Sequence, residues 1–377
     1  MVRREPVIAI AHDYLTQKGG AERVVLAMHR AFPEAKIYTT LYHPEGTFPE
    51  FGGAQIVTSP LNRIPYFRKN HRAALPFLAP ASAALRIPAD IVVSSSSGWA
   101  HGFTTAGSTF VYCHSPARWL YLTEQYVGKS KKRSPGALAV RILGPALRRW
   151  DRRAAARADV YVANSTVVQE RINDVYGMDV DIFHPPHSVD VTGDLEVISG
   201  LEDFVGEGGH YLVVSRLLPY KNVDQAIEAF RGSSERLLII GAGPLAGKLK
   251  AACPPNVRIA SDLSDAEMRW AYSSAKAVIA TSHEDFGITP LEGGAWGKPT
   301  IALRAGGYLD TIVEGITGVF IAEPTSDCIR EAVQDFRENE WDPQGIKNHV
   351  EKFSEQRFRK RLRSDVYEMA RQNAAIN

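Results

Sequence analysis

Short apolar runs alternate with amphipathic helical patterns along most of this chain of 377 residues. The runs typically end in glycine, serine or histidine, and the segments between them carry apolar residues at helical spacing. Continuous apolar runs are typical of strands buried on both faces, and the helical segments between them provide crossover connections. The pattern therefore predicts an α/β fold built on parallel sheets.

The predicted strands form two series along the chain. The first series comprises Val7 to Ala11, Lys36 to Thr40, Ile91 to Ser95, Phe110 to Cys113 and Val160 to Ala163. The second comprises Tyr211 to Ser215, Leu237 to Ile240, Val257 to Ile259, Val278 to Thr281, Thr300 to Leu303 and Gly318 to Ile321. Two series of this kind predict two doubly wound, Rossmann-like domains, and the chain length fits two domains.

The expected domain boundary lies in a segment rich in acidic residues and glycine. We expect an N-terminal domain at residues 1–190, a linker and hinge at 191–209, and a C-terminal domain at 210–354. Glu355 to Gln372 has the pattern of a basic helix. We expect residues 355–377 to pack back toward the N-terminal domain.

Composition restricts the functional classes. The chain is 45% hydrophobic and 23% charged, with a formal net charge of +2, so it has no global signature of nucleic-acid binding. The three cysteines, Cys113, Cys253 and Cys328, lie far apart and show no metal-ligand spacing, which favours a reducing cytoplasm. The N-terminal apolar run is too short for a signal peptide, and no run is long enough to span a membrane.

Glu284 and Glu292 bracket a predicted turn from strand to helix, the place where α/β folds bind ligands. Glu284 lies on the loop and is not at a capping position. Glu292 lies in the first turn of a helix that begins as Thr289-Pro290-Leu291-Glu292, which has the pattern of a capping box. Its carboxylate is therefore expected either to bond the Thr289 amide or to bind a ligand.

Two cations follow the first strand of the second series. Arg216 and Lys221 lie just before a helix for which Asn222 is the expected N-cap and Gln225 its capping-box partner. Arg216 and Lys221 would suit a diphosphate, and solvated surface charge is the alternative. The next strand ends in Gly241-Ala-Gly243, which lacks the third glycine of a dinucleotide fingerprint, so we discount nicotinamide binding.

The N-terminal half has two further candidates. Gly19 and Gly20 precede the helix Ala21 to Ala31, where a backbone without side chains can approach an anion or a sugar or simply form a tight turn. His114 follows a buried strand, where it could hydrogen-bond a ligand hydroxyl, shuttle a proton or be satisfied within the core. Asp179-Val-Asp181 lies in an expected loop, and we assign no metal to it.

These motifs occur together and in order, and as a set they resemble the retaining glycosyltransferases of family 4, which have the GT-B fold. Three segments are similar to sequences of the mannosyltransferase branch: His-Asp-Tyr-Leu, Gly-Gly-Ala-Glu-Arg-Val and Ser-Arg-Leu-Leu-Pro-Tyr-Lys. The resemblance covers nearly the whole chain and implies two Rossmann-like domains that face each other across a cleft. It also implies transfer of a hexose, most simply mannose, to a hydroxyl of a glycan, lipid-linked or small-molecule acceptor in polysaccharide or glycolipid biosynthesis.

The resemblance also implies roles for single residues. Arg216 and Lys221 would bind the diphosphate of a nucleotide sugar, Glu284 the sugar hydroxyls, and His114 the same sugar from the other domain. The remaining donor-binding residues expected are Gly19, Gly20, Gly241, Gly243, Asp262, Leu263, Asp265, Phe286, Gly287, Ile288 and Glu292, the last at the ribose. The acceptor would attack from the face that the diphosphate leaves, so neither a metal nor a cofactor is expected.

The expected donor is GDP-mannose. Asp262 or Asp265 could accept hydrogen bonds from guanine N1 and N2, or these residues could belong to the helix start, with Ser264 or Asp265 as N-cap. A UDP-sugar glycosyltransferase, a nucleotide-sugar epimerase and a non-catalytic nucleotide-sugar binder are the alternatives.

A strongly basic segment lies in the expected acceptor domain. Lys129 to Arg157 contains ten lysines and arginines and a single acid, Asp151, interleaved with apolar residues. This pattern is typical of a surface that meets anionic lipid headgroups, or of a solvated basic helix, and Asn62 to Arg72 could extend it. We expect a cytoplasmic protein, peripheral at the inner face of the plasma membrane if the segment binds lipid, and no nucleic-acid partner.

Overall fold

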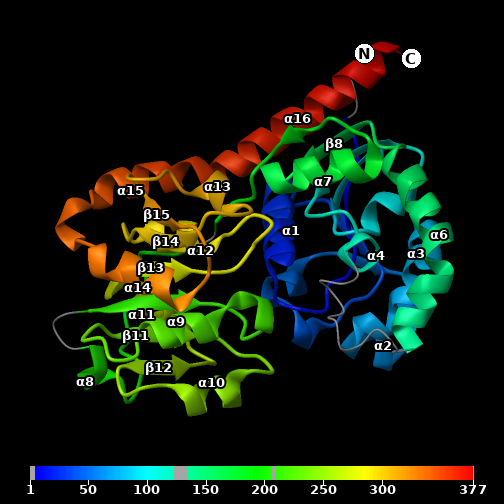
Figure 1. Cartoon of the computed structure of the whole chain (residues 1–377). Coiled ribbons are helices and arrows are strands. Elements are labelled where there is room, and N and C mark those ends of the chain that lie inside the picture. Colours follow the sequence, from blue (N-terminus) through cyan, green and yellow to red (C-terminus); the bar gives the residue numbers. More distant parts are fainter. Residues whose placement is uncertain (1–4, 123–134, 188, 206–208, 377) are drawn as a thin grey trace. The chain divides into compact units, whose positions relative to one another are not determined.

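The computed structural model describes residues 5–122, 135–187, 189–205 and 209–376. The chain divides into two compact units (Figure 1). Unit 1 comprises Met1–Pro186 together with Glu355–Asn377, and unit 2 comprises His187–Ser354.

Unit 1 is built on a parallel sheet of seven strands in the order β3-β2-β1-β5-β7-β8-β9. The strands are β1 (Ile8–His12), β2 (Lys36–Thr39), β3 (Ile56–Thr58), β5 (Ile91–Ser96), β7 (Ser108–Cys113), β8 (Val160–Ala163) and β9 (Asp181–Ile182). A separate pair joins β4 (Arg86–Ile87) to β6 (Thr104–Thr105). All five strands predicted in this half are present. The edge strands β3 and β9 are too short to leave a readable apolar pattern.

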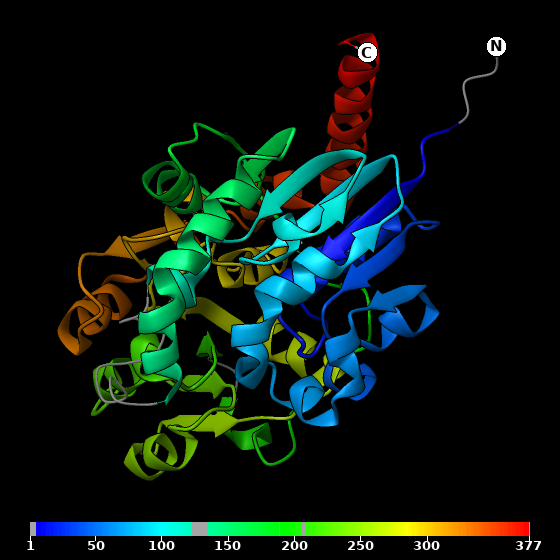
Figure 2. The ribbon, with the colours of Figure 1, turned by 90° about the vertical axis from the view of Figure 1, so that its right-hand side faces the viewer.

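The main helices of unit 1 connect these strands and cover the sheet. They are α1 (Gly20–Ala31), α2 (Pro65–Lys69), α3 (Leu75–Ala84), α4 (Arg118–Tyr121), α6 (Pro135–Ala155), α7 (Thr166–Tyr176) and α16 (Glu355–Ile376). In Figure 2 the long green helix α6 runs beside the blue helix α3.

The C-terminal helix α16 packs against α1 within unit 1. Phe358, Leu362 and Val366 are buried in the same apolar cluster as Ile10 and Phe110 of the sheet. At its start, Glu355 accepts a hydrogen bond from Arg30 of α1, with 2.6 Å between the two atoms. The apolar stripe of this basic helix therefore completes one face of unit 1.

Unit 2 contains a parallel sheet of six strands in the order β12-β11-β10-β13-β14-β15. These are β10 (His210–Val214), β11 (Leu237–Ile240), β12 (Val257–Ala260), β13 (Ala275–Ala280), β14 (Thr300–Leu303) and β15 (Gly318–Ile321). All six were predicted, although β13 begins three residues earlier than expected. The beginning of this strand contains Lys276, whose ammonium donates to Glu235 at 2.7 Å. The alkyl part of a lysine can pack like an apolar side chain, but a lysine interrupts the apolar run in the sequence.

The helices of unit 2 complete its doubly wound fold. They are α8 (Glu202–Val205), α9 (Val223–Ala229), α10 (Ala246–Ala252), α11 (Asp265–Ser273), α12 (Thr289–Ala295), α13 (Tyr308–Thr311), α14 (Ser326–Asp335) and α15 (Pro343–Val350). None of the helices in the described part of the chain has the length and apolar character needed to cross a membrane.

Part of the segment expected to be a linker packs on unit 2. Ile198 and Leu201 are buried in an apolar cluster with Leu212 and Tyr272. The amide of Glu196 also donates to the carbonyl of Ala266 at 3.2 Å. Its acidic and glycine content suggested a linker, but the two apolar side chains anchor residues 196–201 to the sheet.

His210 begins β10 and is fully buried, with its ring 6.1 Å from the ring of Trp270. Burial lowers the pKa of His210 from 6.5 to about 4. At neutral pH the imidazole is neutral in both the folded and the unfolded chain. Below about pH 6.5 the unfolded chain binds a proton that the folded chain excludes, so stability falls as the pH falls toward 4.

We therefore expect His210→Phe to flatten this pH dependence. Phenylalanine keeps a ring against Trp270 and does not titrate. The free energy of unfolding, measured by urea denaturation at about pH 7 and about pH 4, should fall less in the variant, by about 3 kcal/mol, since one pKa unit corresponds to about 1.4 kcal/mol. The matched control is His283→Gln at an exposed position of unit 2. An equal loss in wild type and His210→Phe would contradict the assignment.

Candidate functional site

The candidate residues of unit 2 gather at the carboxyl edge of its sheet. Strands β10 and β13 are neighbours, but the chain continues from β10 toward β11 and from β13 toward β14, on opposite sides. This arrangement is a topological switch point, where open α/β sheets bind ligands. Arg216 and Lys221 follow β10, and Glu284 follows β13, so the fold brings the predicted cations and carboxylate to one edge.

Lys221 and Glu284 form an ion pair, although they are 63 residues apart in the sequence. The ammonium of Lys221 donates to Oε1 of Glu284, and the hydroxyl of Ser282 donates to the same oxygen. The two side chains are 11% and 27% exposed, so the pair is largely shielded from water. It presents a cation and a carboxylate side by side at the switch point.

Tyr220 lies beside both cations. The guanidinium of Arg216 is 3.4 Å from the hydroxyl of Tyr220, and the ammonium of Lys221 is 5.1 Å from the centre of its ring. Arg216 and Tyr220 are both exposed. The guanidinium is therefore accessible to a ligand.

Asn222 occupies the predicted N-cap position of α9, but the capping box expected with Gln225 is wrong. Asn222 has a left-handed backbone with φ of 53°, and its side chain donates to the carbonyl of Thr281 at 2.9 Å instead of capping α9. The hydroxyl of Thr281 in turn donates to the carbonyl of Lys221 at 2.9 Å. Gln225 accepts from the amide of Ser326 at 3.1 Å. Asn222 and Thr281 thus tie the loop of Lys221 to the end of β13, whereas Gln225 bonds to the start of α14.

The capping box expected at Thr289 and Glu292 is also wrong. Helix α12 already includes Thr289, Ile288 occupies the N-cap position, and no side chain caps the helix. Glu292 accepts a hydrogen bond from the hydroxyl of Tyr272 on α11 at 2.8 Å. Its carboxylate therefore links two helices, and its role at a ribose stays a prediction.

The loop that carries Glu284, Phe286, Gly287 and Ile288 is supported by a second loop after β14. The amide of Gly307 donates to the carbonyl of Glu284 at 2.9 Å. A Cβ on Gly307 would lie 2.2 Å from Cα of Phe286, and one on Gly287 would lie 2.4 Å from the ring of Tyr308. The two loops pack backbone against backbone, which fixes the path of residues 284–288.

Sequence reasoning missed Ser282, Gly307 and Tyr308. The hydroxyl of Tyr308 lies 3.2 Å from that of Ser282, which holds Glu284. Burial and the charge of Glu284 raise the pKa of Tyr308 well above its ordinary value, so the hydroxyl stays protonated. The available signal was the Gly-Gly-Tyr sequence directly after a predicted strand.

Gly241 and Gly243 have a packing reason for being glycine. A Cβ on Gly241 would lie 1.9 Å from the carbonyl oxygen of Ser215, and one on Gly243 would lie 2.5 Å from that of Leu217. The turn after β11 therefore presses on the chain that leads to Lys221. Donor binding by these two glycines is still a prediction.

The structure shows which residue is the N-cap of the helix that follows β12. Ser264 is the N-cap of α11 and forms a full capping box with Glu267. Asp262 has a left-handed backbone with φ of 58° and accepts from the hydroxyl of Ser261 at 2.9 Å, and Asp265 is the first residue of the helix. Both aspartates are exposed, and Leu263 packs on an apolar cluster. Neither aspartate is used as the N-cap.

His114 lies in a buried polar cluster of unit 1. It follows β7, is 9% exposed, and its Nε2 is 2.8 Å from the hydroxyl of Ser95 on β5. Burial, with smaller contributions from His12 and Arg118, lowers the pKa of His114 to about 3. His114 is thus a neutral imidazole at physiological pH. Sequence reasoning missed its partners Ser95 and His12.

Gly19 and Gly20 differ in their surroundings. A Cβ on Gly19 would lie 2.5 Å from Oε2 of Glu22, whereas one on Gly20 would meet nothing within 4 Å. Gly19 is the N-cap of α1 and makes no side-chain cap. The atom close to Gly19 is thus the end of the Glu22 side chain, whereas Gly20 leaves open space at the helix start.

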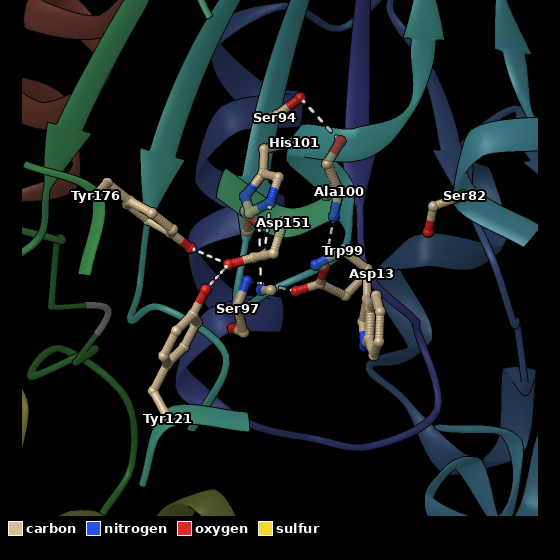
Figure 3. A network of polar contacts seen from close by, with 12 residues as sticks. Asp13, Ser82, Ser94, Ser97, Trp99, Ala100, His101, Tyr121, Asp151 and Tyr176 are labelled. Carbon is tan, nitrogen blue, oxygen red and sulfur yellow. Dashed lines mark hydrogen bonds and ion pairs between the residues drawn. The ribbon is translucent and has the colours of Figure 1, made fainter. Parts of the chain in front are cut away.

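Helix α6 is held to unit 1 by its only acid, Asp151, which is 1% exposed (Figure 3). Its carboxylate accepts from Nε2 of His101 at 3.0 Å and from the hydroxyls of Tyr121 and Tyr176, each at 2.8 Å. Figure 3 also shows Asp13, which accepts from the backbone amides of residues 97, 99 and 100.

The described part of the basic segment carries exposed arginines on α6. Arg149, Arg153 and Arg157 line a cavity of about 300 Å³ together with Gly102 and Trp150. Lys129, Lys131, Lys132 and Arg133 lie outside the described residues. Asp181, from the Asp-Val-Asp sequence, begins the edge strand β9. Across the residues that the structure describes, no three histidine, cysteine, aspartate or glutamate side chains form a group able to hold a metal.

Family models match both halves of the chain. The model for glycosyltransferase family 4 matches residues 18–192, and the model for glycosyl transferases group 1 matches residues 203–359. These ranges include the candidate residues of both units.

Curated relatives match about half of the chain. A GDP-mannose-dependent alpha-(1-6)-phosphatidylinositol monomannoside mannosyltransferase of Mycolicibacterium smegmatis is 29% identical over 51% of this chain and 56% of its own length. The alpha-1,3/1,6-mannosyltransferase ALG2 of Homo sapiens is 30% identical over 48% of this chain and 50% of its own length. The chain thus spans about half the length of these relatives in the matched regions.

Solved structures resemble the whole chain. Sucrose-phosphate synthase from Thermosynechococcus elongatus has a TM-score of 0.69 at 14% identity, covering 98% of this chain and 99% of that one. HepE from Anabaena, in complex with UDP and glucose, has a TM-score of 0.67 at 15% identity, covering 96% and 100%. At such identities the likeness shows the fold alone. With family models on both halves, the chain belongs to the family 4 glycosyltransferases of the GT-B fold and is similar to their mannosyltransferases.

Proposed function

We propose that this protein is a retaining glycosyltransferase that transfers a hexose from a nucleotide-sugar donor to an acceptor hydroxyl. The observation that carries the proposal is the Lys221–Glu284 ion pair at the switch point of unit 2, with the exposed Arg216 on the same loop as Lys221. A diphosphate needs cations, and a sugar needs hydrogen-bond acceptors for its hydroxyls. The pair supplies both within one contact.

The proposed reaction breaks the bond between the anomeric carbon of the sugar and the diphosphate oxygen. The acceptor oxygen bonds to that carbon from the same face, and its proton passes to the departing diphosphate, so the configuration is retained. Arg216 and Lys221 stabilise the negative charge that develops on the leaving group. Glu284 accepts hydrogen bonds from the sugar hydroxyls, His114 bonds to a ligand oxygen, and no protein nucleophile, metal or cofactor takes part in the proposed reaction.

GDP-mannose is the proposed donor. The Mycolicibacterium smegmatis relative is named as GDP-mannose-dependent, and ALG2 is named as a mannosyltransferase. Asp262 and Asp265 are exposed carboxylates at the end of β12, and Ser264 alone serves as the N-cap, so both can accept from guanine. A UDP-sugar is the alternative donor, because the Anabaena structure contains UDP and glucose.

The acceptor side of the proposal rests on α6. We propose that this helix meets an anionic membrane surface, at the inner face of the plasma membrane, where a lipid-linked acceptor would be presented. Its exposed arginines lie on a helix whose only acid is buried and accepts three hydrogen bonds, so every exposed charged side chain described on this helix is a cation. Near α2, the exposed Ile64 and Tyr66 could add apolar contacts.

The donor is tested by calorimetry. GDP-mannose should bind more tightly than UDP-glucose, UDP-N-acetylglucosamine or GDP. Glu284→Gln should weaken GDP-mannose binding without weakening GDP binding, because the glutamine loses the carboxylate proposed to accept from the sugar hydroxyls and leaves the cation of Lys221 available to the diphosphate. The matched control is Glu323→Gln, an exposed carboxylate of the same unit. Tighter binding of a uridine nucleotide would overturn the donor assignment.

The leaving-group role is tested by steady-state kinetics. Arg216→Gln should lower kcat by roughly tenfold to a hundredfold and change the donor KM much less, since a contact that strengthens in the transition state is worth about 1.4 kcal/mol per factor of ten. Arg330→Gln, at a partly exposed position of the same unit where the arginine pairs with Asp327, is the control. Equal effects of Arg216→Gln on KM and kcat would contradict the role.

The membrane contact is tested by vesicle sedimentation. Replacing Arg149, Arg153 and Arg157 together by glutamine should weaken binding to phosphatidylglycerol vesicles by at least tenfold, since each cation contributes about 1 kcal/mol at an anionic surface. The same number of exposed cations is removed elsewhere in unit 1 by Lys36→Gln, Lys360→Gln and Arg371→Gln as a control. If both triple variants bind equally well, α6 is not the membrane-binding surface.

A further inference from the structure

A series of three buried polar side chains lies behind His114 in unit 1. Glu22 on α1 is 3.9 Å from Nε2 of His12, which ends β1. Nδ1 of His12 is 3.0 Å from the carbonyl oxygen and 3.1 Å from the hydroxyl of Ser95, its partner across the ladder on β5. The same hydroxyl is 2.8 Å from Nε2 of His114. Glu22, His12 and Ser95 are at most 2% exposed.

These side chains lie at the switch point of the unit 1 sheet. Strands β1 and β5 are neighbours, while the chain continues from β1 toward β2 and from β5 toward β7, on opposite sides. His12 and Ser95 therefore bridge the switch point of unit 1. The carboxylate of Asp13 holds the loop after Ser95 through backbone amides, which fixes this end of β5.

The hydrogen positions follow from the acceptor at one end. A carbonyl oxygen can only accept, so Nδ1 of His12 must carry the hydrogen that it shares with the carbonyl of Ser95. That nitrogen is then a donor toward the hydroxyl of Ser95 as well. The single hydrogen of the hydroxyl is consequently directed to its other neighbour, Nε2 of His114.

Nε2 of His114 therefore accepts, and the ring of this neutral histidine carries its hydrogen on Nδ1. If Nε2 carried it instead, both histidines would donate to Ser95, and its own hydrogen would have no acceptor among the contacts that the described residues make. Burial keeps the ring neutral, with its pKa lowered to about 3. His114 can thus offer an N–H to a ligand oxygen but has no free lone pair with which to act as a base.

At the other end of this series, Glu22 affects the protonation of His12. Nε2 of His12 and Oε2 of Glu22 are buried and have no hydrogen-bond partner among the described residues, which is costly unless the two side chains attract each other as charges. Burial lowers the pKa of His12, while the Glu22 carboxylate, Asp13 and the Ser95 carbonyl together raise it by more. The net direction is upward, so the pKa of His12 lies above its ordinary value beside the Glu22 carboxylate.

We propose that Glu22, His12 and Ser95 are positioning residues that hold His114 in the Nδ1–H form, so that it acts on a ligand as a hydrogen-bond donor and not as a proton shuttle. The link to sugar transfer rests on the function proposed above. The tautomer itself does not, since it follows from contacts within unit 1.

The tautomer is read by nitrogen-15 NMR of the full chain labelled at histidine. The His114 signals are assigned by their loss in His114→Gln. In wild type near neutral pH, Nδ1 should show the shift of a protonated nitrogen and Nε2 that of an unprotonated one. Detection of the Nε2–H form, which free histidine prefers in water, would overturn the proposal.

Variants of Ser95 and Glu22 test the Ser95–His114 contact and the Glu22–His12 contact separately. Ser95→Ala removes the donor to Nε2 and should move His114 toward the Nε2–H form, whereas Ser95→Thr keeps the hydroxyl and should restore the wild-type spectrum. Glu22→Gln should leave the His114 tautomer unchanged and lower the pKa of His12, followed by its own nitrogen-15 shifts across a pH series. Glu34→Gln, at an exposed position of the same unit, is the matched control. An unchanged His114 spectrum in a folded Ser95→Ala chain would refute the positioning role.

Kinetics then distinguish this proposal from the proposed function. Ser95→Ala should lower kcat by roughly tenfold, the effect of one lost hydrogen bond in the transition state, and Ser95→Thr should recover it. The expected tautomers in a chain that transfers no sugar would refute the proposed function alone. Transfer with the wrong tautomer in wild type would refute the positioning proposal alone.

Discussion

Hydrogen bonding between parallel strands is the constraint on which the rest of this structure depends. It aligns all strands of a unit, so that everything placed just after a strand reaches the same edge of the sheet. The strands themselves are buried and largely apolar, and polar residues on them, such as His12 and Ser95, lie at their carboxyl ends. In both units the polar side chains therefore gather at the carboxyl edge, around the pair of strands where the strand order reverses: β10 and β13 in one unit, β1 and β5 in the other.

This constraint explains why the fold could be predicted from the sequence. Buried strands produce short continuous apolar runs, and every predicted strand is present. The exceptions are informative. Strand β13 starts earlier than predicted because the charged residue Lys276 interrupts its apolar run. Strands β3 and β9 are too short to produce an apolar pattern.

The site could be predicted only in part, because its partners are distant in sequence. Arg216, Lys221 and Glu284 were found by their positions after strands, but the bond between Lys221 and Glu284 joins residues 63 positions apart. Both expected capping boxes failed for the same reason: Asn222 and Glu292 bond to other elements, Thr281 and Tyr272, that lie beside them only in the folded chain. Glu22, His12 and Ser95 were missed because buried polar residues are indistinguishable in sequence from ordinary core and loop positions.

The burial of Asp151 also fixes the rotation of α6 about its own axis. His101, Tyr121 and Tyr176 come from three separate segments, so their common acceptor holds the helix at one rotation about its own axis. Successive residues of a helix are turned by about 100°. Arg149 and Arg153, two positions before and after Asp151, therefore point about 160° away from it. Inserting or deleting a single residue between Asp151 and Arg153 would swing every arginine beyond that point by about 100°, with the composition of the helix almost unchanged.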